Sequence, residues 1–196
     1  MRHLVIVAHP AEDSLTMRVA RIYGAELERL KHSQRTYDLY RMAFNPVLDK
    51  AELPSSGPAH SACADFVSAQ EDVSRADVLP IIYPLWWLSM PAILKGYIDR
   101  VFARGFAYES DNGVVRGLLT GKKAVLITLS GAPLPLLLSS GNWNAVQVLQ
   151  DTHILRAVGF ELLEHLHFDS VVSQTPNEMG AAHLQSTKRC AQAHFG

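Results

Sequence analysis

The sequence has few of the residues and patterns that define several large classes of protein. Its 196 residues include only two cysteines, Cys63 and Cys190, which cannot form a disulfide framework and are typical of free thiols in a reducing cytoplasm. Neither belongs to a C-x-x-C pair, so we expect both to be unreactive. The 18 basic and 19 acidic residues give a formal charge of −1, which argues against a broad surface for nucleic acid or anionic membranes.

Long apolar runs are missing as well. The longest, residues 78–88, is about half of the ~20 residues that a membrane span needs, and two prolines interrupt it. The run at residues 4–8 is too short for the core of a signal peptide. We therefore expect a soluble cytoplasmic protein without membrane insertion. Its length and its 48% hydrophobic content predict a single domain over residues 1–196.

Motifs that mark common enzyme classes are also absent. The first loop has neither G-x-G-x-x-G nor G-x-x-x-x-G-K-S/T, and no serine lies in a G-x-S-x-G elbow. His165, His167 and Asp169 alternate along one predicted strand, which is a conceivable metal site. Strand-end histidines without a second cluster are more often solvent-facing, so we predict no metal. His153 lies on a predicted helix and is interpreted as a surface or interface residue rather than a general base.

What the sequence does contain is an alternation of short apolar runs with amphipathic segments. The predicted strands are residues 4–8, 36–40, 78–83, 123–129 and 160–168, and the predicted helices are residues 15–30, 61–75, 91–104, 143–158 and 177–193. Residues 41–60 hold three prolines and are interpreted as a long surface excursion, and Pro80 is expected at a strand end or bulge. The alternation predicts an α/β fold, a flavodoxin-like three-layer sandwich with a five-stranded parallel sheet in the order 2-1-3-4-5.

A ligand of such a sheet binds at the carboxyl ends of the strands, near the switch in strand order. The first loop there offers His9, Ser14 and Thr16 around a helix start, and helix amides with hydroxyls can hold a phosphate. Glu12 and Asp13 oppose a phosphate unless both point to solvent. Capping of the helix explains Ser14 equally well.

The second loop carries two adjacent tryptophans, Trp86 and Trp87, whose side chains must diverge. At least one is expected to line a cleft or a subunit interface, where it could stack on a flat heteroaromatic ligand. A structural tryptophan that closes the end of the core is an equally good explanation. In the third loop Gly131 permits a close backbone approach to a ligand, which is a weak signal alone.

These three loops, in this order, resemble the NAD(P)H:quinone reductase family, the DT-diaphorase-like flavoproteins of flavodoxin-like fold. The resemblance runs from the N-terminus to about Gly131 and is diffuse beyond Asn144. The segments that carry it are AHPxxxS at residues 8–14, PLWWxxxPAILKGYIDRVF at 84–102, GFAY at 105–108 and LSGAP at 129–133.

The resemblance implies a tightly bound flavin, FAD or FMN, and hydride transfer from NAD(P)H through it to a quinone or similar flat acceptor. It also implies a homodimer that completes each flavin site, with the helix at residues 91–104 at or near the interface. The cofactor-binding residues that it implies are His9, Ser14, Leu15 and Thr16 at the phosphate-bearing tail, Pro84, Leu85, Trp86, Trp87 and Leu88 along the ring, and Thr128, Leu129, Ser130 and Gly131 at its other edge.

The chain departs from the family in two places. Many members have Asn where this chain has Thr16, and long members have a Tyr and a His after the third loop that assist hydride transfer. Residues 134–138 here are leucines and one proline, so we expect an apolar pocket wall and name no catalytic residue. A second hypothesis is an ancillary flavin-binding subunit that regulates a potassium efflux system. The choices between FAD and FMN, between NADH and NADPH, and among acceptors stay open.

Overall fold

The computed structural model describes residues 1–53, 64–172 and 177–196. Five parallel strands form one sheet in the order β2-β1-β3-β6-β7. Counted along the chain within this sheet, the order is 2-1-3-4-5, which confirms the prediction. The strands are β1 (Arg2–Val7), β2 (Ser33–Asp38), β3 (Val78–Pro84), β6 (Lys123–Leu129) and β7 (Glu161–Phe168). The inner strands are mostly apolar and almost wholly buried because helices cover both faces of the sheet.

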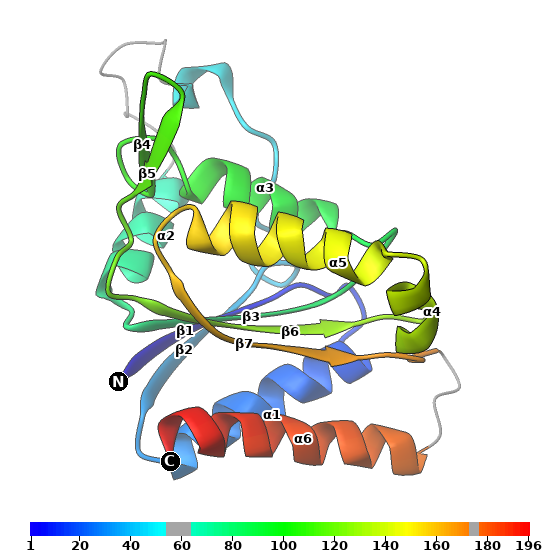
Figure 1. Cartoon of the computed structure of the whole chain (residues 1–196). Coiled ribbons are helices and arrows are strands. Elements are labelled where there is room, and N and C mark those ends of the chain that lie inside the picture. The colour runs from blue at the N-terminus through cyan, green and yellow to red at the C-terminus, as the bar shows by residue number, and fades with distance from the viewer. Residues whose placement is uncertain (54–63, 173–176) are drawn as a thin grey trace.

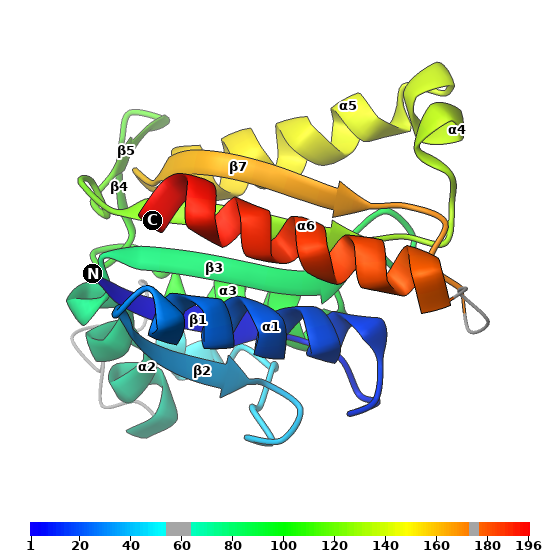
Figure 2. The ribbon, with the colours of Figure 1, turned by 90° about the horizontal axis from the view of Figure 1, so that it is seen from below.

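The helices form the two outer layers (Figures 1 and 2). α1 (Leu15–Arg29) and α6 (Asn177–Phe195) lie side by side on one face, and α2 (Ala64–Arg75), α3 (Ala92–Val101) and α5 (Asn142–Gln147) lie on the other. α5 continues as a π-helical stretch, η3 (Val148–Arg156). Two separate apolar clusters fill the spaces between the sheet and these layers.

Pro80 lies in the middle of β3 rather than at an end or a bulge, so that expectation is wrong. Toward β6 the register is continuous through Pro80, which pairs with Val125. Toward β1 the register keeps one offset from His3–Val78 to Ile6–Ile81 and skips the two positions between them, Leu79 and Pro80. Pro80, which has no backbone N–H to donate, therefore lies where the β1–β3 ladder is interrupted.

The segment after β2 is more than a surface excursion. Phe44 is buried, and Glu52 in the short 3-10 turn η1 (Lys50–Glu52) pairs with Arg100 of α3 at 2.6 Å, with both side chains at most 5% exposed. A Cβ on Gly96 would lie only 2.2 Å from the carbonyl oxygen of Pro46, so the glycine lets this segment touch α3. Residues 54–63, including Cys63 and the first residues of the helix expected from residue 61, lie outside the described part.

Two elements were not expected from the sequence. A hairpin of β4 (Tyr108–Asp111) and β5 (Val114–Gly117) follows α3, and α4 (Leu134–Ser139) occupies the stretch expected to be an apolar pocket wall. α4 lies at the edge of the sheet where the strand arrowheads end (Figure 1). Within the described residues, no helix has the length and apolar character needed to cross a lipid bilayer.

Candidate cofactor site

A cleft of about 540 Å³ opens at the carboxyl ends of β1, β3 and β6. The strand order reverses between β1 and β3, so the loops after these strands lead to helices on opposite faces and leave space between them. The expected cofactor residues that line the cleft are His9, Ser14, Leu15, Thr16, Pro84, Leu85, Trp86, Leu129, Ser130 and Gly131. Trp87, Leu88 and Thr128 lie outside this lining.

One end of the cleft is the N-terminus of α1. Ser14 caps the helix, because its Oγ accepts the Met17 backbone N–H at 3.3 Å, and the first turn holds no acidic residue. Thr16 is buried beside the cap, and Arg18 reaches the cleft from the same turn. Helix amides, hydroxyls and a guanidinium together form a site for a phosphate-sized anion.

His9 is held in one orientation at this end. Its Nδ1 lies 3.0 Å from the Ala11 backbone nitrogen and 3.1 Å from the Ala11 carbonyl oxygen, so Nδ1 ties the ring to the loop. Burial lowers the pKa of His9, which keeps the ring neutral. Arg41 fixes the loop itself, since its guanidinium donates to the carbonyl oxygens of His9 and Pro10 at 3.0 and 3.3 Å.

The two acidic residues of the first loop take different directions. Glu12 is exposed and forms an ion pair with Arg21 at 3.5 Å. Asp13 is exposed but lines the cleft, so one of the two opposing charges remains near the proposed anion position.

The other end of the cleft is aromatic and is built on a strained turn. Trp86 and Ser89 exchange backbone hydrogen bonds of 3.0 and 3.1 Å, and the two residues between them have positive φ angles, 54° at Trp87 and 60° at Leu88. These features define a type I′ turn, which normally requires glycine or asparagine. Trp86 lines the cleft with its ring 5.8 Å from His9, whereas Trp87 is 99% exposed.

Thr128 is fully buried below the cleft and faces β7. Its hydroxyl lies 2.9 Å from Nε2 of His165 and 2.8 Å from Nδ1 of His167. The expectation that these histidines face solvent is therefore wrong, since the His165 side chain is 4% exposed and the Trp143 ring covers both imidazoles. His153 is exposed, in agreement with its interpretation as a surface residue.

Some residues of the cleft were not expected from the sequence. Arg18 lies four positions after Ser14 and so shares its helix face, a spacing that could have identified it. The others come from the loop after β7 and the start of α6, where no motif indicated a site: Val171, Val172, Asn177 and Gly180.

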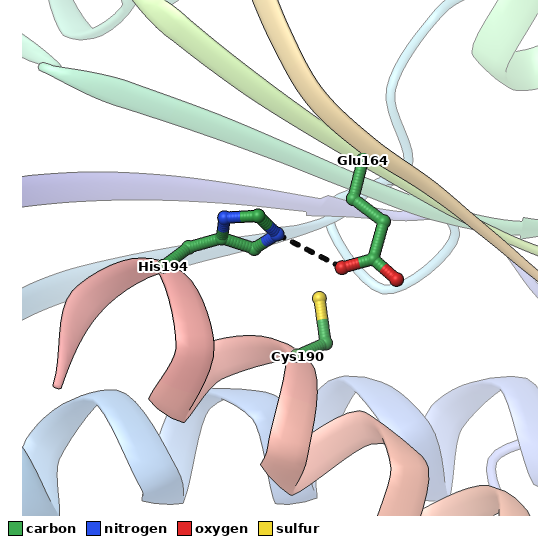
Figure 3. A group of neighbouring side chains, drawn as sticks. All are labelled: Glu164, Cys190 and His194. Carbon is green, nitrogen blue, oxygen red and sulfur yellow. Dashed lines mark hydrogen bonds and ion pairs between the residues drawn. The ribbon is translucent and has the colours of Figure 1, made fainter.

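A second cluster lies on the opposite face of β7, toward α6 (Figure 3). His194 Nε2 lies 2.9 Å from a Glu164 carboxylate oxygen, and the Cys190 thiol points toward the same carboxylate. The potential ligand atoms lie within 4.8 Å of one another, but the hydrogen bonds among the three groups already account for their arrangement. Burial and the carboxylate raise the pKa of Cys190, which keeps the thiol protonated, as expected for an unreactive cysteine.

Comparison with known proteins finds relatives that are named as oxidoreductases. An NAD(P)H oxidoreductase of Haemophilus influenzae, named as uncharacterized, is 37% identical over 128 residues, which cover 63% of this chain and 61% of the relative. NAD(P)H dehydrogenase (quinone) 1 of Cavia porcellus is 32% identical over 182 residues, which cover 83% of this chain and 66% of the relative. The NAD(P)H:quinone oxidoreductase of Methanothermobacter marburgensis matches 100% of this chain and 98% of its own, at 26% identity and a TM-score of 0.89.

The matched regions span 61% and 66% of the length of the Haemophilus influenzae and Cavia porcellus relatives, and 58% of a third relative, from Penicillium crustosum. The family model for the flavodoxin-like fold matches residues 1–190 of this chain. The strand order and the position of the cleft agree with that match. The chain belongs to the family of proteins with the flavodoxin-like fold.

Proposed function

We propose that this protein is a flavin-dependent NAD(P)H oxidoreductase that passes hydride from NAD(P)H to a quinone or a similar flat acceptor in the cytoplasm. One observation carries the proposal: a single cleft joins an anion-binding helix N-terminus to an aromatic wall at the switch in strand order. A flavin mononucleotide unit has a phosphate at one end and a flat ring at the other. The names of the relatives agree with this chemistry.

The residues present fit such a group. Thr16, Arg18 and the imidazole of His9 would bind its phosphate, and Trp86 with the backbone of residues 129–131 would enclose its ring. A bound flavin supplies the hydride chemistry, accepting hydride from a nicotinamide and passing it to an acceptor. The protein orients the reactants and excludes water, and the apolar side chains of Leu85, Trp86 and Leu129 suit that role.

We also propose that the protein acts as a homodimer. Trp87 on the strained turn is 99% exposed, and Leu136 and Leu138 on neighbouring α4 are 59% and 57% exposed. Large exposed apolar side chains beside a cleft are typical of a surface that contacts a second copy of the chain. The expected interface helix, α3, buries most of its apolar side chains within the protomer and exposes the Lys95–Asp99 ion pair. The turn and α4 therefore supply the apolar surface for the contact.

Titration of the purified protein with FMN and with riboflavin, followed by quenching of flavin fluorescence, tests the phosphate end of the site. Arg18→Gln removes a charge-assisted hydrogen bond and is expected to weaken FMN binding by about tenfold or more. Riboflavin has no phosphate, so its affinity should be unaffected. Arg21→Gln is the matched control, because Arg21 lies on the same helix and pairs with Glu12 outside the cleft.

A protein that binds neither FMN nor FAD contradicts the proposal. Equal loss of FMN and riboflavin affinity in Arg18→Gln would place the phosphate elsewhere. Steady oxidation of NADH or NADPH with a quinone then tests turnover, and flavin binding without turnover favours the regulatory-subunit hypothesis.

A further inference from the structure

An unbroken chain of side-chain hydrogen bonds runs under the cleft and ends at its wall. Asp151 Oδ1 lies 2.8 Å from His165 Nδ1, and His165 Nε2 lies 2.9 Å from the Thr128 hydroxyl. That hydroxyl lies 2.8 Å from His167 Nδ1, and His167 Nε2 lies 3.1 Å from the hydroxyl of Ser130, which lines the cleft. Period-two alternation on adjacent β6 and β7 places Thr128, His165 and His167 on one face, in register at Thr128 and His167, and Ser130 is the first residue after β6.

The chain is largely shielded from solvent, and Ser130 at the cleft wall is only 5% exposed. Thr128 and Asp151 are 0% and 7% exposed, and the ring of Trp143 lies 4.9 and 4.5 Å from the two imidazole rings. Burying so many polar groups is costly unless each has a partner, and here each has one. Of these residues, only Ser130 also lines the cleft, and its hydroxyl donates to the Ala132 carbonyl oxygen at 2.8 Å, a bond that a ligand oxygen in the cleft would replace.

The carboxylate fixes the direction of the hydrogen bonds from Asp151 to His167 in the resting state. Asp151 can only accept, so His165 donates from Nδ1 and its Nε2 accepts from Thr128. Thr128 then accepts from Nδ1 of His167, whose Nε2 is left as an acceptor 3.1 Å from the Ser130 hydroxyl, with the Ala132 carbonyl oxygen at 2.8 Å as the competing acceptor. One added proton reverses the direction of the three bonds beyond His165, because His165 becomes an imidazolium that also donates to Thr128.

We propose that Ser130, His167, Thr128, His165 and Asp151 form a proton relay that protonates the acceptor bound in the cleft. This inference rests on the proposed function. A quinone that receives a hydride equivalent, derived from NAD(P)H, needs one further proton to become a hydroquinone. Ser130 touches the acceptor and is the catalytic residue, and the other four are positioning residues.

The protons balance through the relay. In the loaded state His165 is an imidazolium beside Asp151, and Ser130 directs its O–H to the acceptor oxygen. As that O–H bond breaks, Ser130 takes the proton of His167 Nε2, His167 Nδ1 takes that of Thr128, and Thr128 takes that of His165 Nε2. The relay is left in its resting direction with His165 neutral, and water entering the open cleft reloads it by the reverse hops.

The charges around the relay favour this location for the extra proton. Burial and neighbouring His165 lower the pKa of His167 to about 4, which disfavours a charge on that ring, whereas the His165 ring has the Asp151 carboxylate 2.8 Å from its Nδ1. Asp169 is otherwise engaged, since its carboxylate accepts the Leu134 backbone N–H at 2.8 Å. The titratable groups that act on the relay from the surrounding elements are Tyr83 on β3, Asp151 on η3, Asp169 just after β7 and His183 on α6.

The test uses the flavin-loaded protein with Thr128→Val, which breaks the relay in the middle without altering the cleft lining. Turnover with a quinone is compared with turnover with ferricyanide, an acceptor that takes electrons and no proton. General acid catalysis contributes about 10²–10⁴-fold, so we expect the quinone-to-ferricyanide ratio to fall by at least about tenfold. Thr128→Ser keeps the hydroxyl and should restore the ratio. A variant that folds poorly loses both activities together and leaves the ratio unchanged, and Asp151→Asn then supplies the second variant.

A second readout does not depend on activity. Nitrogen chemical shifts of the two imidazoles, measured by NMR, should show both rings protonated at Nδ1 in the resting protein, with this preference lost for His167 in Thr128→Val. Unchanged ratios in well-folded Thr128→Val and Asp151→Asn, or rings protonated at Nε2, would overturn the relay. Absence of any NAD(P)H oxidation in the wild type would instead refute the proposed function, while the NMR result would still report on the relay's geometry.

Discussion

Trp87 has a strained backbone conformation at the mouth of the cleft. A residue with a Cβ at positive φ is strained by roughly 1–2 kcal/mol, and nothing within the described protomer compensates a side chain that is 99% exposed. Such strain at the mouth of a cleft indicates selection for a ligand or a second protomer rather than for stability of the monomer.

Trp87→Asn should therefore stabilise the fold. Asparagine tolerates the left-handed conformation, whereas Trp87→Ala removes the same indole but keeps the strain. We expect the unfolding free energy of Trp87→Asn to exceed that of Trp87→Ala by about 1 kcal/mol in urea titrations. Comparing the two variants cancels any contact of the indole ring. Equal stabilities would show that the turn is not strained.

The Cys190 thiol should be inert in the folded protein. It is buried, and burial with the nearby Glu164 carboxylate raises its pKa, so little thiolate is available. In a Cys63→Ser background, a thiol-specific reagent should label Cys190 more than about tenfold faster in denaturant than in buffer. Rapid stoichiometric labelling without denaturant would contradict the burial seen here.

At this scale the sequence predicted the residue types of the site better than their orientations. His9, Ser14 and Trp86 line the cleft. Their place could be predicted because apolar runs mark the strand ends and a capping residue marks the start of the helix. The burial of His165 and His167 was not predictable, since it depends on Trp143, a residue distant in sequence that packs over them only in the folded chain.

Among the elements, α3 and the segment at residues 41–53 are joined by a buried ion pair. Glu52→Gln removes the carboxylate charge from this buried ion pair with Arg100 and is expected to lower the unfolding free energy by about 3–5 kcal/mol. Asp99→Asn on the same helix removes an exposed pair with Lys95 and should cost only about 0.3–0.5 kcal/mol. Urea unfolding compares the two. Similar losses would show that burial of the Arg100 pair has no energetic consequence.

The elements that were predicted well share one property, which is burial on both faces. β3 and β6 are continuous apolar runs, and their hydrophobicity alone identifies them. The β4–β5 hairpin was missed because its strands are short and mostly exposed, so neither an apolar run nor an alternation marks them. The switch from α5 to the π-helical η3 likewise has no local signal that sequence reasoning could use.

For the whole molecule, buried neutral histidines predict loss of stability in acid. Burial is the main cause that lowers the pKa of His3 and of His167 to about 4, while an unfolded chain titrates near about 6.5. Between these values the unfolded state binds more protons, so stability falls as pH falls through this window. The slope is at most about 1.4 kcal/mol per pH unit for each group.

Urea unfolding across this pH window measures the slope. His3→Leu should reduce the slope by up to about 1.4 kcal/mol per pH unit, which is what one histidine contributes. His153→Gln, at an exposed position, should leave the slope unchanged. A His3→Leu protein with the wild-type slope would show that His3 does not remain neutral in the folded state.

At the same scale, the order of the sheet was predictable because alternating strands and helices allow few topologies. That order also located the cleft, since the switch point follows from topology alone. The sequence did not predict the contribution of α6, because no motif connects its first residues with the three cleft loops that lie earlier in the chain.

The central claim is that the cleft holds a flavin that exchanges hydride with NAD(P)H and a quinone. The most direct test is the visible absorption spectrum of the FMN- or FAD-saturated protein, recorded without oxygen during stepwise addition of NADH or NADPH and then of a quinone. The account predicts that the flavin band fades in proportion to the nicotinamide added and returns with the quinone. A protein that retains no flavin, or whose flavin band neither nicotinamide bleaches, would contradict it.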